Sequence, residues 1–212
     1  MLTIQILVDT PNSWIIPYAK QLITKLVNMG YNASLKLSHD EVVTGDILCL
    51  LSCEKIFRKL NMNTHNLVVH ESNLPKGKGW SPLTWQILEG KNIIPITLFE
   101  ASDTIDSGMI YIQKTIELDG TELLDEIKHK QGQLTIDLII EFIEKHPNNL
   151  GKKQEGESTF YKKRGSAESE LNINKTIVEN FNLLRVCDNE RYPAYFIYKN
   201  CKYILKVEKI KL

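Results

Sequence analysis

The chain has 212 residues, 42% of them hydrophobic, which is enough to bury one full core and a small addition. Its 26 basic residues balance its 26 acidic ones, so the composition excludes a uniformly basic nucleic-acid-binding domain. Residues 1–150 carry 13 Lys and Arg against 18 Asp and Glu, and residues 151–212 carry 13 against 8, a surplus that solvated surface lysines would explain.

The N-terminus predicts a strand followed by a helix. The apolar stretch 2–8 predicts the strand, and the spacing of Ile15, Leu22 and Leu26 predicts an amphipathic helix that ends near Gly30. The first residues lack a basic start and a long apolar core. We therefore expect no signal peptide, no membrane span and a cytoplasmic protein.

Strands and helices continue to alternate through the rest of residues 1–150. Strands are predicted over residues 33–37, 46–52, 67–70, 93–99 and 109–116. Helices are predicted over 55–60, over 81–90 with Ser81 as N-cap and Pro82 in the first turn, and over 122–145 between a Thr121 cap and Pro147. Such regular alternation indicates an α/β layer fold.

A polar segment from Gly151 predicts a linker or an exposed excursion. Beyond it, the pattern predicts a helix over 175–184 and a hairpin of residues 195–198 and 203–205 turned at 199–202. We therefore divide the chain into a main domain, residues 1–150, and a small α+β C-terminal addition, residues 151–212.

Cysteine and histidine spacing predicts no metal site. The four cysteines lack zinc-site spacing and are expected to be buried thiols in a reducing compartment: Cys49, Cys53, Cys187 and Cys201. Four histidines have no evident partner and are expected at the surface: His39, His65, His129 and His146.

The run from His70 to Pro82 carries the strongest functional signal. It follows the apolar stretch 66–69 and contains an imidazole, hydroxyls, two lysines and two glycines, as expected of a functional loop leaving a buried strand. Asp106 follows another predicted strand, and a carboxylate can fix the tautomer of a histidine that exchanges protons. By themselves, a histidine and an aspartate thirty-six residues apart are better explained as two unrelated surface residues.

A family resemblance changes that balance. The run His70-Glu71-Ser72-Asn73-Leu74-Pro75, with Lys78-Gly79, Pro82, Trp85, Gly90, Thr97 and Asp106-Ser107-Gly108, resembles the signature of the 10-formyltetrahydrofolate-dependent formyltransferases in order and spacing. The resemblance covers about residues 45–146 and continues more weakly into 156–164. It implies a Rossmann-like open, mainly parallel sheet with helices on both faces. It also implies an enzyme that moves a formyl group from 10-formyltetrahydrofolate to an amine.

The resemblance assigns the proton-handling roles. His70 would transfer protons beside the tetrahedral intermediate, and Asp106 would orient His70 and help deprotonate the attacking amine. The family places an oxyanion-donating asparagine where this chain has Val68, which shares the face of His70 but cannot donate. Ser72 and Asn73 are the nearest candidates to replace it. A protein that binds but does not catalyse is the alternative.

Further residues are expected to bind the donor and the acceptor. The resemblance places the folate beside Ser52 and a loop formed by Ser102, Asp103, Thr104 and Ile105. A phosphate would fit Lys76, Gly77 and Lys78, which otherwise form a solvated loop. Strand-end and aromatic residues that could contact the acceptor, or only pack, are Asn12, Ser13, Trp14, Trp80 and Trp85.

The acceptor is predicted from the same resemblance. Related enzymes act on methionyl-tRNA, on glycinamide ribonucleotide or on nucleotide-linked amino sugars. The short C-terminal part and the run from Val69 to Pro82 most resemble bacterial sugar N-formyltransferases of the pseudaminic-acid branch, which use UDP-4-amino-4,6-dideoxy-N-acetyl-altrosamine. A methionyl-tRNA formyltransferase-like enzyme and a folate or nucleotide-sugar binding module are the alternatives. We expect a small-molecule partner rather than nucleic acid or membrane, and the sequence allows a homodimer.

Overall fold

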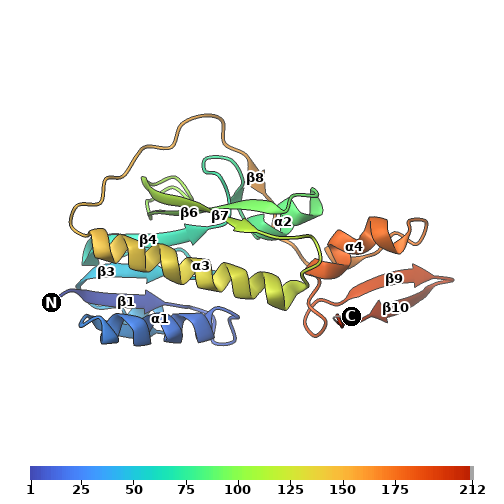
Figure 1. Ribbon diagram of the computed structural model, residues 1–212, viewed down its shortest axis with the longest axis horizontal. Helices are drawn as coiled ribbons and strands as arrows, with labels where there is room; N and C mark the ends of the chain where they lie inside the picture. Colours follow the sequence, from blue (N-terminus) through green and yellow to red (C-terminus); the bar gives the residue numbers. More distant parts are fainter. Residues whose placement is uncertain (211–212) are drawn as a thin grey trace.

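The computed structural model describes residues 1–210, and a six-stranded sheet forms its centre (Figure 1). Four strands run parallel in the order β2 (Asn32–Lys36), β1 (Thr3–Leu7), β3 (Gly45–Leu50) and β4 (Asn63–His70). Two antiparallel strands extend the sheet beyond β4, namely β6 (Ile93–Glu100) and β7 (Ile110–Glu117). This confirms the predicted α/β class with a mainly parallel sheet.

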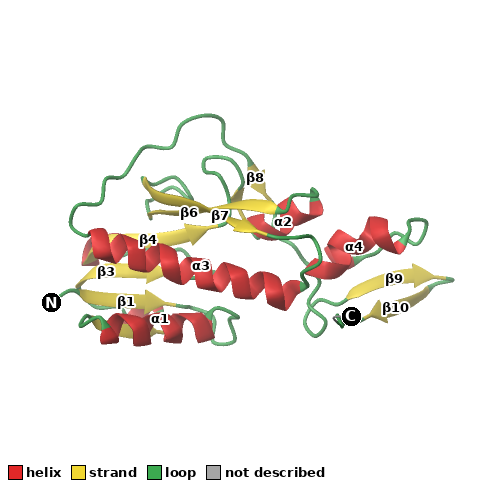
Figure 2. Cartoon of the chain, viewed as in Figure 1, coloured by secondary structure: helices red, strands yellow, loops and turns green. Residues whose placement is uncertain are grey.

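The α-helices are α1 (Ile16–Asn28), α2 (Pro82–Leu88), α3 (Leu124–Lys145) and α4 (Ile177–Val186) (Figure 2). In Figure 1, α1 and α3 lie side by side in front of the sheet, where Leu22 and Phe142 are fully buried in one apolar cluster. On the opposite face, the helical cover near β3 is reduced to two 3-10 turns, η1 (His39–Glu41) and η2 (Leu60–Met62). That face carries Val68 and His70, because side chains alternate along β4.

Two local expectations are wrong, and a third is met only in part. Residues 55–59 form no helix but an irregular loop that buries Phe57 in the apolar cluster with Leu48 and Leu50, and the Asp9 carboxylate accepts the N–H groups of Glu54 and Lys55 at its start. Thr121 does not cap α3, whose N-cap residue Leu123 donates its N–H to Glu126 at 2.9 Å. Ser81 is the N-cap residue of α2 and Pro82 opens the helix, as predicted, although Ser81 has a φ of 51° and its side chain makes no capping hydrogen bond.

The segment after α3 returns to the main sheet's loops. It arches from the end of α3 to β8 (Phe160–Tyr161), along the top of Figure 1. There β8 pairs in parallel with β5 (Lys78–Gly79), inside the loop that follows His70. Neither two-residue strand was predicted, since segments this short show no hydrophobic period. The proposed division at residue 150 remains a prediction.

The C-terminal helix and hairpin form as predicted. After the 3-10 turn η3 (Ser166–Ser169) and helix α4, β9 (Ala194–Tyr198) and β10 (Cys201–Leu205) pair antiparallel at one end of the molecule (Figure 1). Lys199 and Asn200 both have positive φ, as a two-residue hairpin turn requires. The fully buried Arg185 of α4 donates to Asn92 Oδ1 at 2.7 Å and ties this end to the main sheet.

The cysteines differ in their surroundings. Cys49 and Cys187 are buried and Cys53 is half-buried, but Cys201 is exposed, because it lies on the open hairpin. The expectation of four buried thiols is therefore wrong for Cys201. Burial raises the pKa of Cys49 and of Cys53 to about 12. Among residues 1–210, no helix has both the length and the apolar character needed to cross a membrane.

Candidate active site

His70 occupies the last position of β4, with its side chain only 9% exposed. Its Nε2 atom lies 2.8 Å from the carbonyl oxygen of Gly77 and 3.8 Å from Oδ2 of Asp106. A carbonyl oxygen can only accept a hydrogen bond, so Nε2 carries the hydrogen. In the neutral ring, Nδ1 is then the basic nitrogen, and within residues 1–210 it makes no hydrogen bond.

Asp106 reaches His70 because its loop folds back along the sheet. Glu100, at the end of β6, pairs with Leu67 of β4, so the loop that follows must return toward His70 over about 10 Å, three residue steps of ~3.3 Å along β4. Asp106 adopts a φ of 51°, and its Oδ2 accepts the N–H of Gly79 at 2.9 Å. A side chain at Gly108 would collide with the carbonyl oxygen of Glu100, which explains the glycine of the Asp-Ser-Gly motif.

Two glycines let the His70 loop pack closely against its neighbours. Gly79 has a φ of 94°, and a Cβ there would lie 2.5 Å from the carbonyl oxygen of Tyr161. Gly77 has a φ of 74°, and a Cβ there would lie 2.9 Å from Cβ of Ser72. Only glycine permits both conformations and both contacts. The loop can therefore present the carbonyl of Gly77 to His70 and the N–H of Gly79 to Asp106.

The two predicted replacements for the missing oxyanion donor have different surroundings. Ser72 is only 2% exposed, and its hydroxyl has no hydrogen-bond partner within the described chain. Asn73 is exposed, and its Oδ1 accepts from Nε2 of Gln113 at 3.1 Å. Gln113 also donates to Thr97 Oγ1 at 3.1 Å, in a cross-strand row that continues to His70. Asn73 therefore keeps its Nδ2 donor unused, in the part of the chain described.

Glu71, which the sequence did not single out, is a second carboxylate beside His70. Its Oε1 accepts from Nε2 of Gln131 on α3 at 2.7 Å, and its carbonyl oxygen accepts from Nε2 of Gln86 at 2.6 Å. Burial raises the pKa of the Glu71 carboxyl, and the charge of His70 and the bond from Gln131 offset only part of that rise. Glu71 therefore joins the His70 loop to α2 and α3.

The residues predicted to hold the folate lie on two exposed stretches. Ser52 follows β3 with a φ of 52°. Ser102, Asp103, Thr104 and Ile105 lie on the loop that leads to Asp106, where Ser102 Oγ donates to the carbonyl oxygen of Thr104 at 2.8 Å. The first stretch leaves the carboxyl end of β3, and the second runs to Asp106 beside the end of β4. Both stretches border the His70 face.

Asp9 anchors the loop that contains Ser52. Its carboxylate accepts the N–H groups of Glu54 at 2.8 Å and Lys55 at 2.9 Å, and it lies 3.2 Å from Nε2 of His39. Burial raises the pKa of Asp9, but the bonds from Glu54, Lys55 and His39 outweigh it and hold the pKa below its usual value. The sequence missed this role, because an aspartate after a strand has many possible partners.

Two histidines expected at the surface instead have carboxylate partners. His39 contacts Asp9, and Nδ1 of His65 lies 3.1 Å from Oε2 of Glu100, which also accepts the hydroxyl of Tyr111. Burial and the neighbouring Glu100 raise the pKa of Tyr111. The surface expectation is therefore wrong for His39 and His65, since their partners come from distant strands.

The residues predicted to bind the acceptor are not all free to do so. Lys78 is buried and donates to Ser107 Oγ at 2.7 Å, whereas Lys76 is exposed on the loop. Trp85 donates to the carbonyl oxygen of Lys162 at 2.9 Å and stacks on Tyr161. The Lys78 ammonium therefore helps to fix the Asp106 loop.

The other aromatic and strand-end residues are more open. Trp80 is 40% exposed, with the ammonium of Lys163 4.4 Å from its ring centroid. Asn12 is exposed at the carboxyl end of β1, while Ser13 and Trp14 are half-buried and Trp14 packs edge-on against Tyr18. Asn12, Ser13 and Trp14 follow β1 and therefore lie two strands away from β4, since β3 separates β1 from β4.

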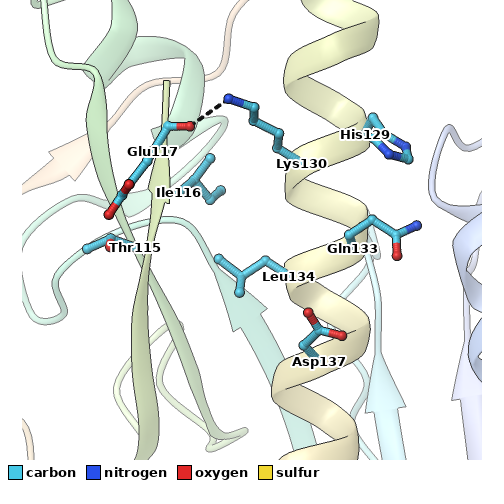
Figure 3. Close-up of a pocket in the computed structure, with 8 residues that line it drawn as sticks. All are labelled: Thr115, Ile116, Glu117, His129, Lys130, Gln133, Leu134 and Asp137. Carbon is cyan, nitrogen blue, oxygen red and sulfur yellow. Dashed lines mark hydrogen bonds between the residues drawn. The ribbon is translucent and has the colours of Figure 1, made fainter. Parts of the chain in front are cut away.

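A pocket of about 330 Å³ lies elsewhere, between β7 and α3 (Figure 3). Its lining includes Ile116, Leu134 and Asp137, and Lys130 crosses it to donate to the carbonyl oxygen of Glu117 at 2.8 Å. None of the predicted site residues lines this pocket.

Three site residues from the polar segment after Gly151 were also missed. Gln154 bonds the carbonyl oxygens of Asp106 and Gly108, Thr159 bonds the loop at Gly77, and Tyr161 belongs to β8. The weak continuation of the resemblance into 156–164 was the one available signal.

Comparison with known proteins identifies the family. Residues 36–143 match the family described as formyl transferase. A methionyl-tRNA formyltransferase from Thermodesulfovibrio yellowstonii is 29% identical over 146 residues, which are 68% of this chain and 45% of that protein. The chain spans about half the length of the curated relatives it matches.

Two solved structures share the fold. A methionyl-tRNA formyltransferase from Clostridium thermocellum superposes with a TM-score of 0.83 at 24% identity, covering 100% of this chain and 94% of that one. A 4-N formyltransferase from Francisella tularensis superposes with a TM-score of 0.69 at 18% identity, covering 100% and 99%. These likenesses confirm the Rossmann-like architecture.

Proposed function

The chain belongs to the formyl transferase family, and we propose that it is a sugar N-formyltransferase that uses 10-formyltetrahydrofolate as its formyl donor. The observation that carries the proposal is the placement of two largely buried side chains, His70 and Asp106, whose Nε2 and Oδ2 atoms lie 3.8 Å apart. In the reaction, a bond forms between the acceptor nitrogen and the formyl carbon, and the bond from that carbon to the folate nitrogen breaks. One proton passes from the amine to the departing tetrahydrofolate.

The chain supplies groups suited to each proton movement. An alkyl amine is mostly protonated at neutral pH, and the Asp106 carboxylate can take that proton. Nδ1 of His70 can take a proton and return it to the leaving nitrogen, because Nε2 is occupied by Gly77. The oxyanion would be stabilised by the unused Nδ2 of Asn73 and by the protonated form of His70, since Val68 cannot donate.

The acceptor we propose is a nucleotide-linked 4-amino-4,6-dideoxy sugar, specifically UDP-4-amino-4,6-dideoxy-N-acetyl-altrosamine. A cluster of cations and aromatic rings supports it: Lys163 lies over Trp80, and Lys162 and Arg164 lie over Trp85 at 5.8 and 5.9 Å. Ammonium groups suit a diphosphate, and an exposed ring suits a base. Trp80 directly follows Gly79, whose N–H binds Asp106, so a sugar could bridge the cluster and the catalytic pair.

Methionyl-tRNA is the second candidate acceptor, because curated relatives at 26–32% identity are named methionyl-tRNA formyltransferases. In that case, the cluster around Trp80 would contact the nucleic acid instead. With the amino-sugar acceptor as the first candidate, we also propose that the protein is cytoplasmic, takes part in surface glycan biosynthesis and forms homodimers.

A direct assay separates the two acceptors. Purified protein is incubated with 10-formyltetrahydrofolate and either UDP- or dTDP-linked 4-amino sugars or methionyl-tRNA, and tetrahydrofolate release and product mass are measured. The proposal expects release and a formylated product only with an amino sugar. Release only with methionyl-tRNA would establish the second candidate. No release with any acceptor would favour a binding module.

A further inference from the structure

We propose that residues 151–161, hereafter the strap, position both catalytic groups, with Thr159 acting on His70 and Gln154 acting on Asp106. The inference rests on the proposed function, since it names positioning residues for that reaction. The strap leaves the end of α3 and arches to β8 (Figure 1). It is first pinned to β7, where Lys152 and Ile110 exchange two backbone hydrogen bonds of 2.8 Å.

Thr159 fixes the peptide group that holds His70. The carbonyl oxygen of Thr159 accepts the N–H of Lys78 at 2.9 Å, and that N–H belongs to the same planar peptide as the carbonyl of Gly77. The other side of this peptide accepts the Nε2 hydrogen of His70 at 2.8 Å. Because the N–H and C=O of a trans peptide point in opposite directions, Thr159 and His70 hold the peptide from its two sides.

The hydroxyl of Thr159 fixes the preceding peptide as well. Its Oγ1 accepts the N–H of Gly77 at 2.8 Å. Gly77 has a φ of 74°, a conformation that glycine adopts freely and that nothing in the residue itself would lock. With both flanking N–H groups bound by Thr159, the carbonyl of Gly77 stays aimed at Nε2 and keeps the hydrogen on that nitrogen.

Gln154 performs the matching task at Asp106. Its Nε2 donates to the carbonyl oxygens of Asp106 and Gly108, both at 3.0 Å. Asp106 has a φ of 51°, in the left-handed region, which is less favourable than the ordinary backbone regions for residues other than glycine, although aspartate tolerates it better than most. Bridging the carbonyls on either side of Ser107 helps to hold the loop in this conformation. The carboxylate of Asp106 is thereby held where it meets Gly79 and His70.

Substitutions in the whole protein test both positions. Thr159→Val keeps the side-chain shape but loses the acceptor oxygen, and Gln154→Leu loses both donors. We expect Thr159→Val to lower kcat about tenfold, the effect of one hydrogen bond, and Gln154→Leu to lower it at least as much, with the KM for 10-formyltetrahydrofolate unchanged in both. Thr159→Ser should restore kcat. Ser158→Ala, at an exposed strap position without a side-chain bond in the described chain, is the matched control and should match the wild type.

A second readout needs no substrate. In protein labelled with ¹⁵N-histidine, the imidazole nitrogens of His70, assigned by their loss in His70→Ala, report which nitrogen carries the hydrogen. The wild type should show the Nε2–H tautomer, and Thr159→Val should show a mixture. Unchanged kcat and unchanged tautomer in Thr159→Val would overturn the role of Thr159. If the tautomer shifts as expected but the wild type transfers no formyl group, the proposed function fails while the positioning role stands.

Discussion

Nε2 of His70 lies 2.8 Å from the carbonyl oxygen of Gly77, closer than it lies to the Asp106 carboxylate. The backbone carbonyl, rather than the carboxylate, therefore sets which nitrogen of the imidazole carries the hydrogen. Asp106 is held instead by the N–H of Gly79 and stays 3.8 Å from the ring. The two groups are separate enough to act on different atoms of a substrate that lies against both.

Gly79→Ala should disable the site. A methyl group there would lie 2.5 Å from the carbonyl oxygen of Tyr161, at a φ of 94°. We expect kcat to fall at least about a hundredfold, because the loop must shift and the N–H bond to Asp106 is lost, and stability to fall by about 1–3 kcal/mol. Gly90→Ala is the control: its φ is 87° with nothing within 4 Å, so it should lose about 1 kcal/mol and keep its kcat. Equal kcat in both variants would contradict the role of Gly79.

Val68→Asn should change kcat by no more than about tenfold, because Asn73 and protonated His70 already supply donors. A gain of about a thousandfold would show that this chain lacks a compensating donor. Asn73→Ala, in contrast, should lower kcat by about a hundredfold or more, the usual cost of one oxyanion donor. The kinetics of both variants, compared with the wild type, distinguish these accounts.

The sequence was sufficient for the main strands and for singling out His70 and Asp106, which lie 3.8 Å apart in the structure, but not for the contacts that hold these two residues in place. The alternation that ends at His70 and the Asp-Ser-Gly motif at 106–108 are local patterns, and the structure brings them together. The pairing of β5 with β8 joins residues about eighty positions apart through two-residue strands, which no periodicity reveals. The helix expected over 55–60 is replaced by a loop whose contacts involve residues distant in sequence, such as the bonds from Glu54 and Lys55 to Asp9.

Asp9→Asn should loosen the loop that we propose to contact the folate. An amide has one acceptor oxygen, so either the Glu54 or the Lys55 N–H loses its partner, at about 1.5–3 kcal/mol. The KM for 10-formyltetrahydrofolate should rise about tenfold or more, with a smaller change in kcat. An unchanged KM for 10-formyltetrahydrofolate would show that the loop held by Asp9 does not contribute to folate binding. Asp103→Asn, an exposed position on the other proposed folate loop, shows whether removing a charge alone raises the KM.

Glu71→Gln should stabilise the protein increasingly as the pH rises. Burial raises the pKa of Glu71, so the folded state favours the protonated carboxyl. The protonated carboxyl's contribution to the stability of the wild type is fully present below the ordinary pKa of a glutamate. It is lost as the pH rises through the raised pKa of Glu71. Glutamine keeps an oxygen for Gln131 without ionising.

Denaturant midpoints at about pH 5 and about pH 8 measure the effect of Glu71→Gln. The gain over the wild type should be larger at the higher pH. Glu144→Gln, on the exposed side of α3, should show no such pH-dependent gain. If the stability gained by Glu71→Gln does not grow with pH, the folded state accepts the ionised Glu71 carboxylate without cost, which contradicts the raised pKa.

The most direct measurement is tetrahydrofolate release by the wild type and by His70→Ala, with 10-formyltetrahydrofolate and UDP-4-amino-4,6-dideoxy-N-acetyl-altrosamine. We expect turnover by the wild type and a loss of about a hundredfold to ten-thousandfold in His70→Ala, the usual contribution of a proton-transfer group. Circular dichroism of the variant confirms that it is folded. Equal turnover by the folded variant would contradict the account.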